Sequence, residues 1–70
     1  MLQLKAEIQN SGLKATPQRI AILGAMHKLG HASADMVADQ LTDIFPSLTV
    51  ATIYNVLESF VEKKIVVRRF

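Results

Sequence analysis

The sequence of 70 residues is long enough for one small domain, and because it contains no cysteine it excludes disulfides, thiolate zinc sites and cysteine nucleophiles. Half of the residues are hydrophobic and 20% are charged, which is typical of a globular protein and excludes a disordered tail. The net charge is +2, but it is uneven: residues 1–30 and 47–70 carry an excess of Lys and Arg, whereas residues 31–46 contain three aspartates and no Lys or Arg. No apolar run approaches the roughly 18 residues of a membrane span, and the N-terminus lacks a signal peptide, so we expect a cytoplasmic protein.

Apolar spacing predicts two helices in the first 30 residues. The first runs from about Leu2 to Ser11, and Gly12 ends it. The second begins at Thr16-Pro17, because Thr is a good N-cap and Pro suits the first helical position, where its missing N–H is not needed. Gly30 ends this second helix, whose broad apolar stripe predicts a central, largely buried position.

The middle of the chain predicts two more helices. Ser33 caps a third helix with a clear amphipathic pattern that includes Ile44 and Phe45, and Pro46 stops it. Thr49 caps a fourth helix that extends from about Val50 to Lys63. On a helical wheel, the apolar face of this helix comprises Val50, Ile53, Leu57, Phe60 and Val61.

The final stretch, Ile65 to Phe70, is rich in β-branched residues and predicts a strand without a partner, as if a hairpin were cut. The third and fourth helices are joined by only about four residues, Pro46 to Thr49, which is the turn of a helix-turn-helix. The predicted fold is therefore mainly α: a winged helix-turn-helix with about four helices followed by a truncated β wing. We expect residues 1–70 to form this one domain.

The outward face at the start of the fourth helix is small or neutral and polar, and comprises Ala51, Thr52, Asn55 and Ser59. Such a face suits close approach to base edges in the major groove, where Asn pairs well with adenine. An ordinary solvated face is the alternative, and the pattern leaves both open. Tyr54 lies at the boundary of this face, either as a base contact or as a rim residue with its hydroxyl in water.

Basic residues close to a helix N-terminus oppose the helix dipole and therefore indicate another role. Lys14 lies just before the second helix and Arg19 lies in its first turn. A DNA phosphate is one candidate partner, and an Arg whose stem covers apolar surface is the alternative. Arg68 and Arg69 alternate across the predicted strand, so at most one of them faces a groove of the DNA backbone directly, and we expect Arg68 to be the DNA contact.

The sequence gives little support to a metal site or to an enzyme. His27 and His31 are four residues apart, but Gly30 intervenes, and two histidines fall short of the three or four ligands of a metal. Asp35, Asp39 and Asp43 follow one stripe, which is typical of a solvated face turned away from DNA. No catalytic triad, carboxylate pair or phosphate-binding glycine loop is present.

Three segments, in order, resemble motifs of the ferric uptake regulator family. They are LKATPQRIAIL at 13–23, HASAD at 31–35 and FPSLTVATIYNVL at 45–57. A later segment, beginning at Lys64, resembles the entry to the wing of that family, with Lys in place of the usual Gly.

The resemblance implies a bacterial transcription repressor whose N-terminal domain binds double-stranded DNA, at an A·T-rich palindromic operator. By motif, Lys14 would reach the minor groove, Arg19 and Thr49 would hold phosphates, and the major groove would be met by Ala51, Thr52 and Tyr54. Homodimerisation would use a C-terminal domain that this chain does not contain.

The resemblance also implies a divalent metal, iron, manganese or zinc, in the full-length protein, and no cofactor bound by this chain alone. His31 matches the one regulatory-metal ligand that the DNA-binding domain donates. Asn55 after Tyr54 favours the peroxide-sensing branch over the iron-sensing branch, which stays an alternative. A second alternative is a winged helix that binds a protein partner through its fourth helix instead of DNA.

Overall fold

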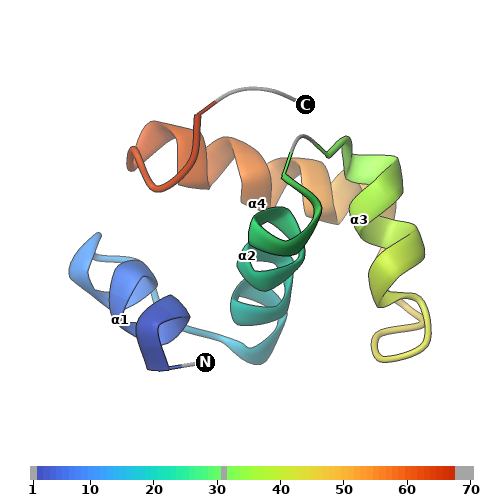
Figure 1. The fold of residues 1–70 in the computed structure, drawn as a ribbon, viewed down its shortest axis with the longest axis horizontal. Helices are drawn as coiled ribbons and strands as arrows, with labels where there is room; N and C mark the ends of the chain where they lie inside the picture. The colour runs from blue at the N-terminus through green and yellow to red at the C-terminus, as the bar shows by residue number, and fades with distance from the viewer. Residues whose placement is uncertain (1, 31, 68–70) are drawn as a thin grey trace.

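The computed structural model describes residues 2–30 and 32–67. It contains four helices in this part of the chain, and their bounds are α1 Leu2–Asn10, α2 Pro17–Leu29, α3 Ala34–Leu41 and α4 Val50–Glu62. In Figure 1, α2 lies in the middle, α1 packs on one side of it and α3 on the other, and α4 crosses behind. The mainly helical part of the predicted fold is therefore confirmed.

Side-chain caps start three of the helices, as the sequence predicts. The side-chain oxygens of Thr16, Ser33 and Thr49 accept backbone N–H groups three residues later, at 3.2, 3.2 and 3.1 Å. Each cap satisfies an N–H group that has no partner within its own helix. Since the caps fix where α2, α3 and α4 begin, they also fix which faces of these helices point inward.

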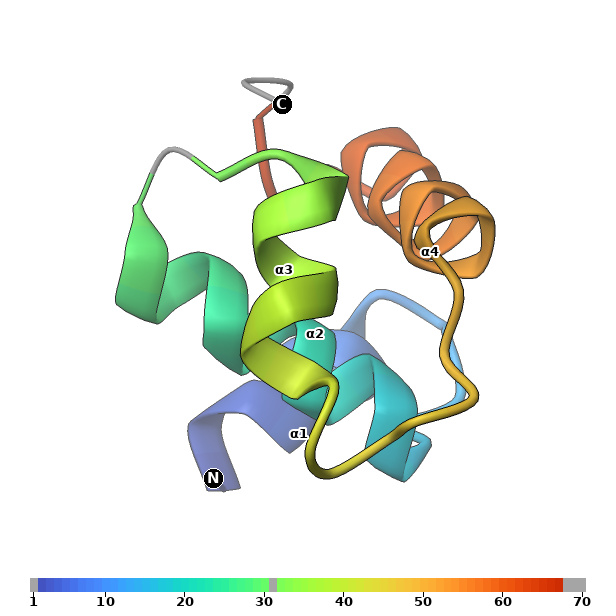
Figure 2. The ribbon, with the colours of Figure 1, turned by 90° about the vertical axis from the view of Figure 1, so that its right-hand side faces the viewer.

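The hydrophobic core is built around α2, which contacts all three other helices. Figure 2 shows α3 and α4 packed around it from a second direction. Gly24 of α2 lets α1 approach closely, because a Cβ at this position would lie only 3.2 Å from Leu4 Cδ1. The large side chains that are fully buried come from all four helices, and they are Ile8, Ile22, Leu23, Val37, Ile53, Leu57 and Phe60.

The predicted extent of the third helix is wrong at its C-terminal end. α3 ends at Leu41 instead of continuing to Phe45, so the connection to α4 spans residues 42–49 and is longer than the four residues predicted. Pro46 explains the early end, because the residue before a proline is disfavoured in the α conformation and proline has no N–H. Phe45 turns back onto the core, with its N–H bonded to Leu41 O at 2.8 Å, while Ile44 is 67% exposed.

No strand forms over the described part of the predicted wing, residues 65–67, and residues 68–70 lie outside the description. Instead, α4 ends in a Schellman turn in which Lys64 N–H bonds to Val61 O and Ile65 N–H to Phe60 O, at 3.0 and 2.8 Å. Ile65 packs back against the hydrophobic core. A β-branched stretch without a neighbouring strand has no ladder to join, so this local turn decides the conformation.

Within the described residues, no helix is long and apolar enough to cross a membrane.

Candidate nucleic-acid interface

One face of α4 is buried in the core and the other carries small or neutral side chains at the surface. Ile53, Leu57 and Phe60 are fully buried on the inner face. The side chains on the outer face are exposed, and they are Ala51, Thr52, Tyr54 and Asn55. Tyr54 is 45% exposed, so its ring lies partly against the helix and partly in solvent. This face is free of Lys, Arg, Asp and Glu over residues 50–57.

The N-terminus of α4 is organised by two threonines. Thr49 is exposed, and its hydroxyl lies 3.0 Å from the hydroxyl of Thr52 while it also accepts the Thr52 N–H. Both hydroxyls are therefore oriented by the cap. Val50 is 41% exposed, which corrects its predicted place on the buried face: the first turn of α4 projects past the core.

Ser59 differs from the other polar residues predicted on this face. Its hydroxyl donates a hydrogen bond of 2.7 Å to Val56 O, one turn earlier in α4, and the residue is only partly exposed. Because this hydroxyl proton is used inside the helix, the outward polar surface is concentrated in the first two turns.

The connector before α2 presents the second group of predicted residues. Lys14 is exposed, whereas Arg19, in the first turn of α2, is half-buried. Arg19 Nη1 donates a hydrogen bond of 2.8 Å to the Lys14 carbonyl oxygen. This contact is not predictable from sequence alone, because it joins a side chain in a helix to the backbone of an irregular segment.

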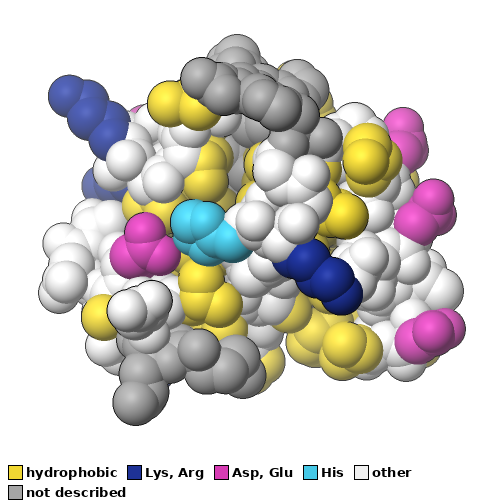
Figure 3. Space-filling model, in the orientation of Figure 1, with side chains coloured by type: hydrophobic (Ala, Val, Ile, Leu, Met, Phe, Trp, Pro, Cys, Tyr) yellow, Lys and Arg dark blue, Asp and Glu magenta, His cyan; other side chains and the backbone are white. Residues whose placement is uncertain are grey.

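The predicted contact segments and the predicted stripe of aspartates can both be located on the molecule. In Figure 2 the connector before α2, the loop between α3 and α4, and α4 itself lie along the same side of the molecule. Asp35, Asp39 and Asp43 are exposed, and Figure 3 shows acidic side chains along the edge formed by α3. The predicted solvated stripe of aspartates is therefore confirmed.

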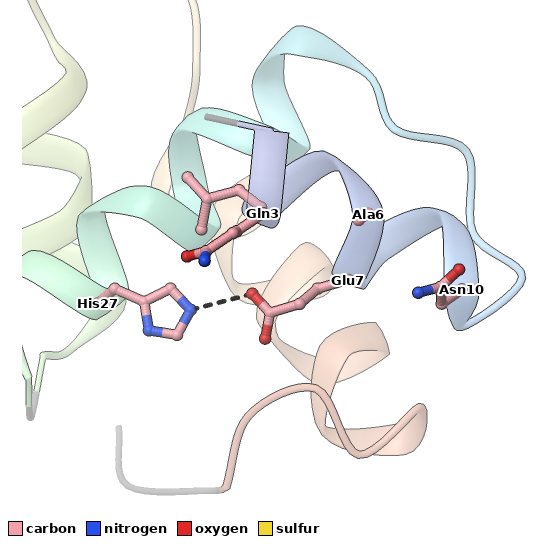
Figure 4. A pocket seen from close by; sticks show the side chains of 6 residues that line it. Gln3, Ala6, Glu7, Asn10 and His27 are labelled. Carbon is pink, nitrogen blue, oxygen red and sulfur yellow. Dashed lines mark ion pairs between the residues drawn. The ribbon is translucent and has the colours of Figure 1, made fainter.

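A hollow between α1 and α2 contains a contact between a histidine and a carboxylate that the sequence did not predict, and this contact is an ion pair only when His27 is protonated. His27 Nε2 lies 3.4 Å from Glu7 Oε2, and the two side chains are 54% and 45% exposed. Figure 4 shows them directed toward one another from the two helices, with Gln3 and Asn10 on the α1 side. A pair this exposed contributes little to stability, about 0–1 kcal/mol.

The residues that the structure describes do not make a complete metal site. Over residues 2–30 and 32–67, no three His, Asp or Glu side chains come together as ligands. His31, the predicted metal ligand, and Arg68, a predicted DNA contact, lie outside the described residues.

A second hollow of about 540 Å³ lies between the N-terminal end of α2 and the loop after α3. Its lining is apolar and comprises Pro17, Ile20, Ala21, Leu41, Ile44 and Phe45. The hollow exists because α3 ends early and its following turn leaves Ile44 at the surface. Sequence reasoning missed it for that reason, since it placed Ile44 within a continuous helix.

Residues 10–69 match the ferric uptake regulator family. The chain belongs to this family. The match contains both segments that the structure places on one side of the molecule, namely the connector before α2 and the helix α4.

Curated relatives of the chain include a peroxide operon regulator and peroxide-responsive repressors. The peroxide operon regulator of Bacillus subtilis is 38% identical over 60 residues, which cover 84% of this chain and 41% of that protein. The peroxide-responsive repressor PerR of Staphylococcus saprophyticus is 45% identical over 56 residues, covering 76% of this chain and 36% of that protein. The peroxide-responsive repressor PerR of Staphylococcus aureus strain Mu50 is 41% identical over 56 residues, which cover 79% of this chain and 38% of that protein.

The chain thus spans about two fifths of the length of the relatives that it matches. No solved structure matches the chain significantly.

Proposed function

We propose that this chain is the DNA-binding domain of a bacterial, metal-responsive transcriptional repressor, with α4 as the recognition helix. The observation that carries the proposal is the division of α4 into a buried apolar face and an exposed face of small, neutral residues. A helix of this kind can enter the major groove without carboxylates that phosphates would repel. A binding role of this type needs no catalytic group, so the protein is not an enzyme.

The exposed residues of α4 divide between bases and backbone. Ala51 and Thr52 allow close approach to base edges, Tyr54 packs on a thymine methyl, and Asn55 offers its amide to adenine. Thr49, at the exposed N-terminus of α4, contacts a phosphate. The role of Thr49 is the one that the family resemblance implies, and the exposure of all five side chains supports these proposed roles.

The connector supplies a contact outside the major groove. Lys14 is exposed in the connector, and we propose that it reaches the adjacent minor groove, as the family resemblance implies. Arg19, which the family resemblance assigns to a phosphate, and Arg68, which lies outside the described residues, are proposed as further DNA contacts. Two copies of the protein bind an A·T-rich palindrome, because two recognition helices then read equivalent half-sites about one helical turn apart.

We further propose that the protein responds to peroxide and not to iron supply. Asn55 follows Tyr54, and the similar proteins of Bacillus and Staphylococcus carry names that refer to peroxide. The metal of the regulator, iron, manganese or zinc, would be held largely by residues other than those described. Deletion of the gene should raise expression of peroxide-detoxifying genes, and a rise confined to iron-uptake genes would contradict this proposal.

Two substitutions test the base contacts. Tyr54→Ala and Lys14→Ala should each weaken binding to an A·T-rich palindromic duplex more than binding to a scrambled duplex of the same length, by about 1–3 kcal/mol for a base contact. Fluorescence anisotropy on both duplexes measures the two losses. Gln40→Ala, at an exposed position of α3, is the control and should change neither affinity. Equal losses on both duplexes would show that these residues do not read bases.

The alternative function, binding of a protein partner through α4, differs in its dependence on salt. A DNA-binding domain releases counterions from phosphates, so its affinity for the duplex should fall steeply between about 50 and 200 mM salt. A chain without such a fall, or without affinity for DNA at low salt, would favour the protein-binding alternative.

A further inference from the structure

The backbone of the connector before α2 is fixed by several hydrogen bonds that meet at Lys14 and Thr16. The Lys14 carbonyl oxygen accepts two of them, from Thr16 N–H at 3.1 Å and from Arg19 Nη1 at 2.8 Å. Thr16 in turn accepts Arg19 N–H at its hydroxyl, at 3.2 Å, and Ile20 N–H at its carbonyl, at 3.0 Å. Arg19 is thus bonded to the connector through both its backbone and its guanidinium group.

The basic residues Lys14 and Arg19 differ in their exposure to solvent, and this difference bears on their roles. Lys14 is exposed and available to a ligand, whereas Arg19 is half-buried as a residue, although its hydrogen bond to the Lys14 carbonyl is itself exposed to solvent. One Nη1–H of the guanidinium is directed at a carbonyl of the protein itself. A residue placed in this way can act on a ligand by fixing its neighbour.

We propose that Arg19 is a positioning residue for Lys14: its guanidinium holds the Lys14 backbone so that the lysine side chain projects toward the minor groove. The inference rests on the proposed DNA-binding function and specifies how one contact of that function is built. It differs from the role implied by the family resemblance, in which Arg19 holds a phosphate directly.

The physical benefit of such a bond is a smaller loss of entropy on binding. Residues 13–16 have no regular secondary structure, so without the bonds the connector would sample more backbone conformations. Ordering a free backbone residue costs about 1–2 kcal/mol. Because Arg19 orders the connector before DNA arrives, Lys14 binds with less of this cost.

A double-mutant cycle separates the two roles of Arg19. Arg19→Met keeps an unbranched apolar stem but removes the charge and every N–H of the guanidinium. With Lys14 present, Arg19→Met should weaken binding to the A·T-rich duplex about fivefold, the value of one hydrogen bond. In the Lys14→Ala background the same change should weaken binding less than twofold, because the side chain that Arg19 positions is gone.

A direct phosphate contact predicts a different result. Arg19→Met would then weaken binding by the same factor in both backgrounds, and in the Lys14→Ala background it would lower the salt slope by about 0.9. Either of these findings overturns the inference while leaving the proposed function in place. Loss of affinity for DNA at low salt in the unmodified chain would instead refute the proposed function itself.

An NMR measurement without DNA tests the positioning role independently. Arg19→Met should shift the backbone amide signals of Ala15 and Thr16 and should speed hydrogen exchange at Thr16 N–H. The amide signals of α4 should stay in place. Unchanged connector signals would overturn the inference. Far-UV circular dichroism tests whether the Arg19→Met variant is helical. If the Met variant is not helical, Arg19→Gln, whose side chain is too short to reach the Lys14 carbonyl, replaces it in both experiments.

Discussion

At the scale of single residues, Thr49 has a structural role in capping α4 that is distinct from its proposed contact with a phosphate. Its hydroxyl caps α4 through Thr52 N–H at 3.1 Å and also contacts the Thr52 hydroxyl at 3.0 Å. Sequence alone predicted the cap, because Thr before an apolar helical pattern is a local signal. It did not predict the contact between the two hydroxyls, which depends on side-chain rotamers.

Removing the Thr49 cap should destabilise the protein, whereas a substitution that keeps the hydroxyl should not. Thr49→Val removes the acceptor oxygen and should lower the free energy of unfolding by about 1 kcal/mol, or Tm by about 4–8 °C. Thr49→Ser keeps the hydroxyl and should unfold near the original Tm, as measured by circular dichroism in a thermal scan. Equal Tm values for the Val and Ser variants would show that the hydroxyl does not stabilise α4.

At the scale of elements, the C-terminal ends of both helices of the helix-turn-helix depart from the sequence prediction. α3 stops at Leu41 and the chain after α4 folds back at Lys64, where φ is +61°. In both places a turn that returns an apolar side chain to the core, Phe45 or Ile65, is favoured over continuation of the predicted element. Periodicity identifies which residues are apolar, but it does not say where the chain must bend to bury them.

Lys64 provides a test of this turn. A non-glycine residue in the left-handed region costs about 1–2 kcal/mol, so Lys64→Gly should raise the free energy of unfolding by about 1 kcal/mol. Lys63→Gly removes the same charge from a residue with φ of −88° and should lower stability by about 0.5–1 kcal/mol. Urea denaturation of both variants measures the difference, and a Lys64→Gly variant no more stable than the Lys63→Gly variant would refute the turn.

At the scale of the whole molecule, one small core holds four helices together, and α4 contributes both to that core and to the proposed interface. Phe60 is fully buried, two turns beyond the exposed residues Thr52 and Tyr54. A change at the core end of α4 should therefore affect the whole fold, and with it the position of the outward face.

Phe60→Ala should cost about 3–5 kcal/mol, which is close to the whole stability of a domain of this size. We expect the variant to lose most of its helical circular dichroism at 25 °C and, as a consequence, its affinity for DNA. Val67→Ala is the control: Val67 is 64% exposed, so its truncation should change stability by less than about 0.5 kcal/mol. A folded Phe60→Ala variant would mean that the helices are held by contacts other than this core.

The sequence by itself determined the features that depend on neighbouring residues in the chain. These include the caps at Thr16, Ser33 and Thr49, the ends of helices at Gly12 and Gly30, the burial of Ile53, Leu57 and Phe60 in α4, and the motifs of the ferric uptake regulator family. Each rests on residues a few positions apart, so local physical chemistry is enough to predict it.

Only the tertiary structure decided what depends on contacts between elements. The Glu7–His27 pair joins α1 to α2, the hollow beside Ile44 needs α2 next to the end of α3, and Ile65 turns toward a core that four helices create. The bond from Arg19 to the Lys14 carbonyl likewise depends on how the connector approaches α2. Such contacts depend on how the helices pack against one another. This packing is driven by the total apolar surface that it buries, which is a property of all the helices together and not of any one segment.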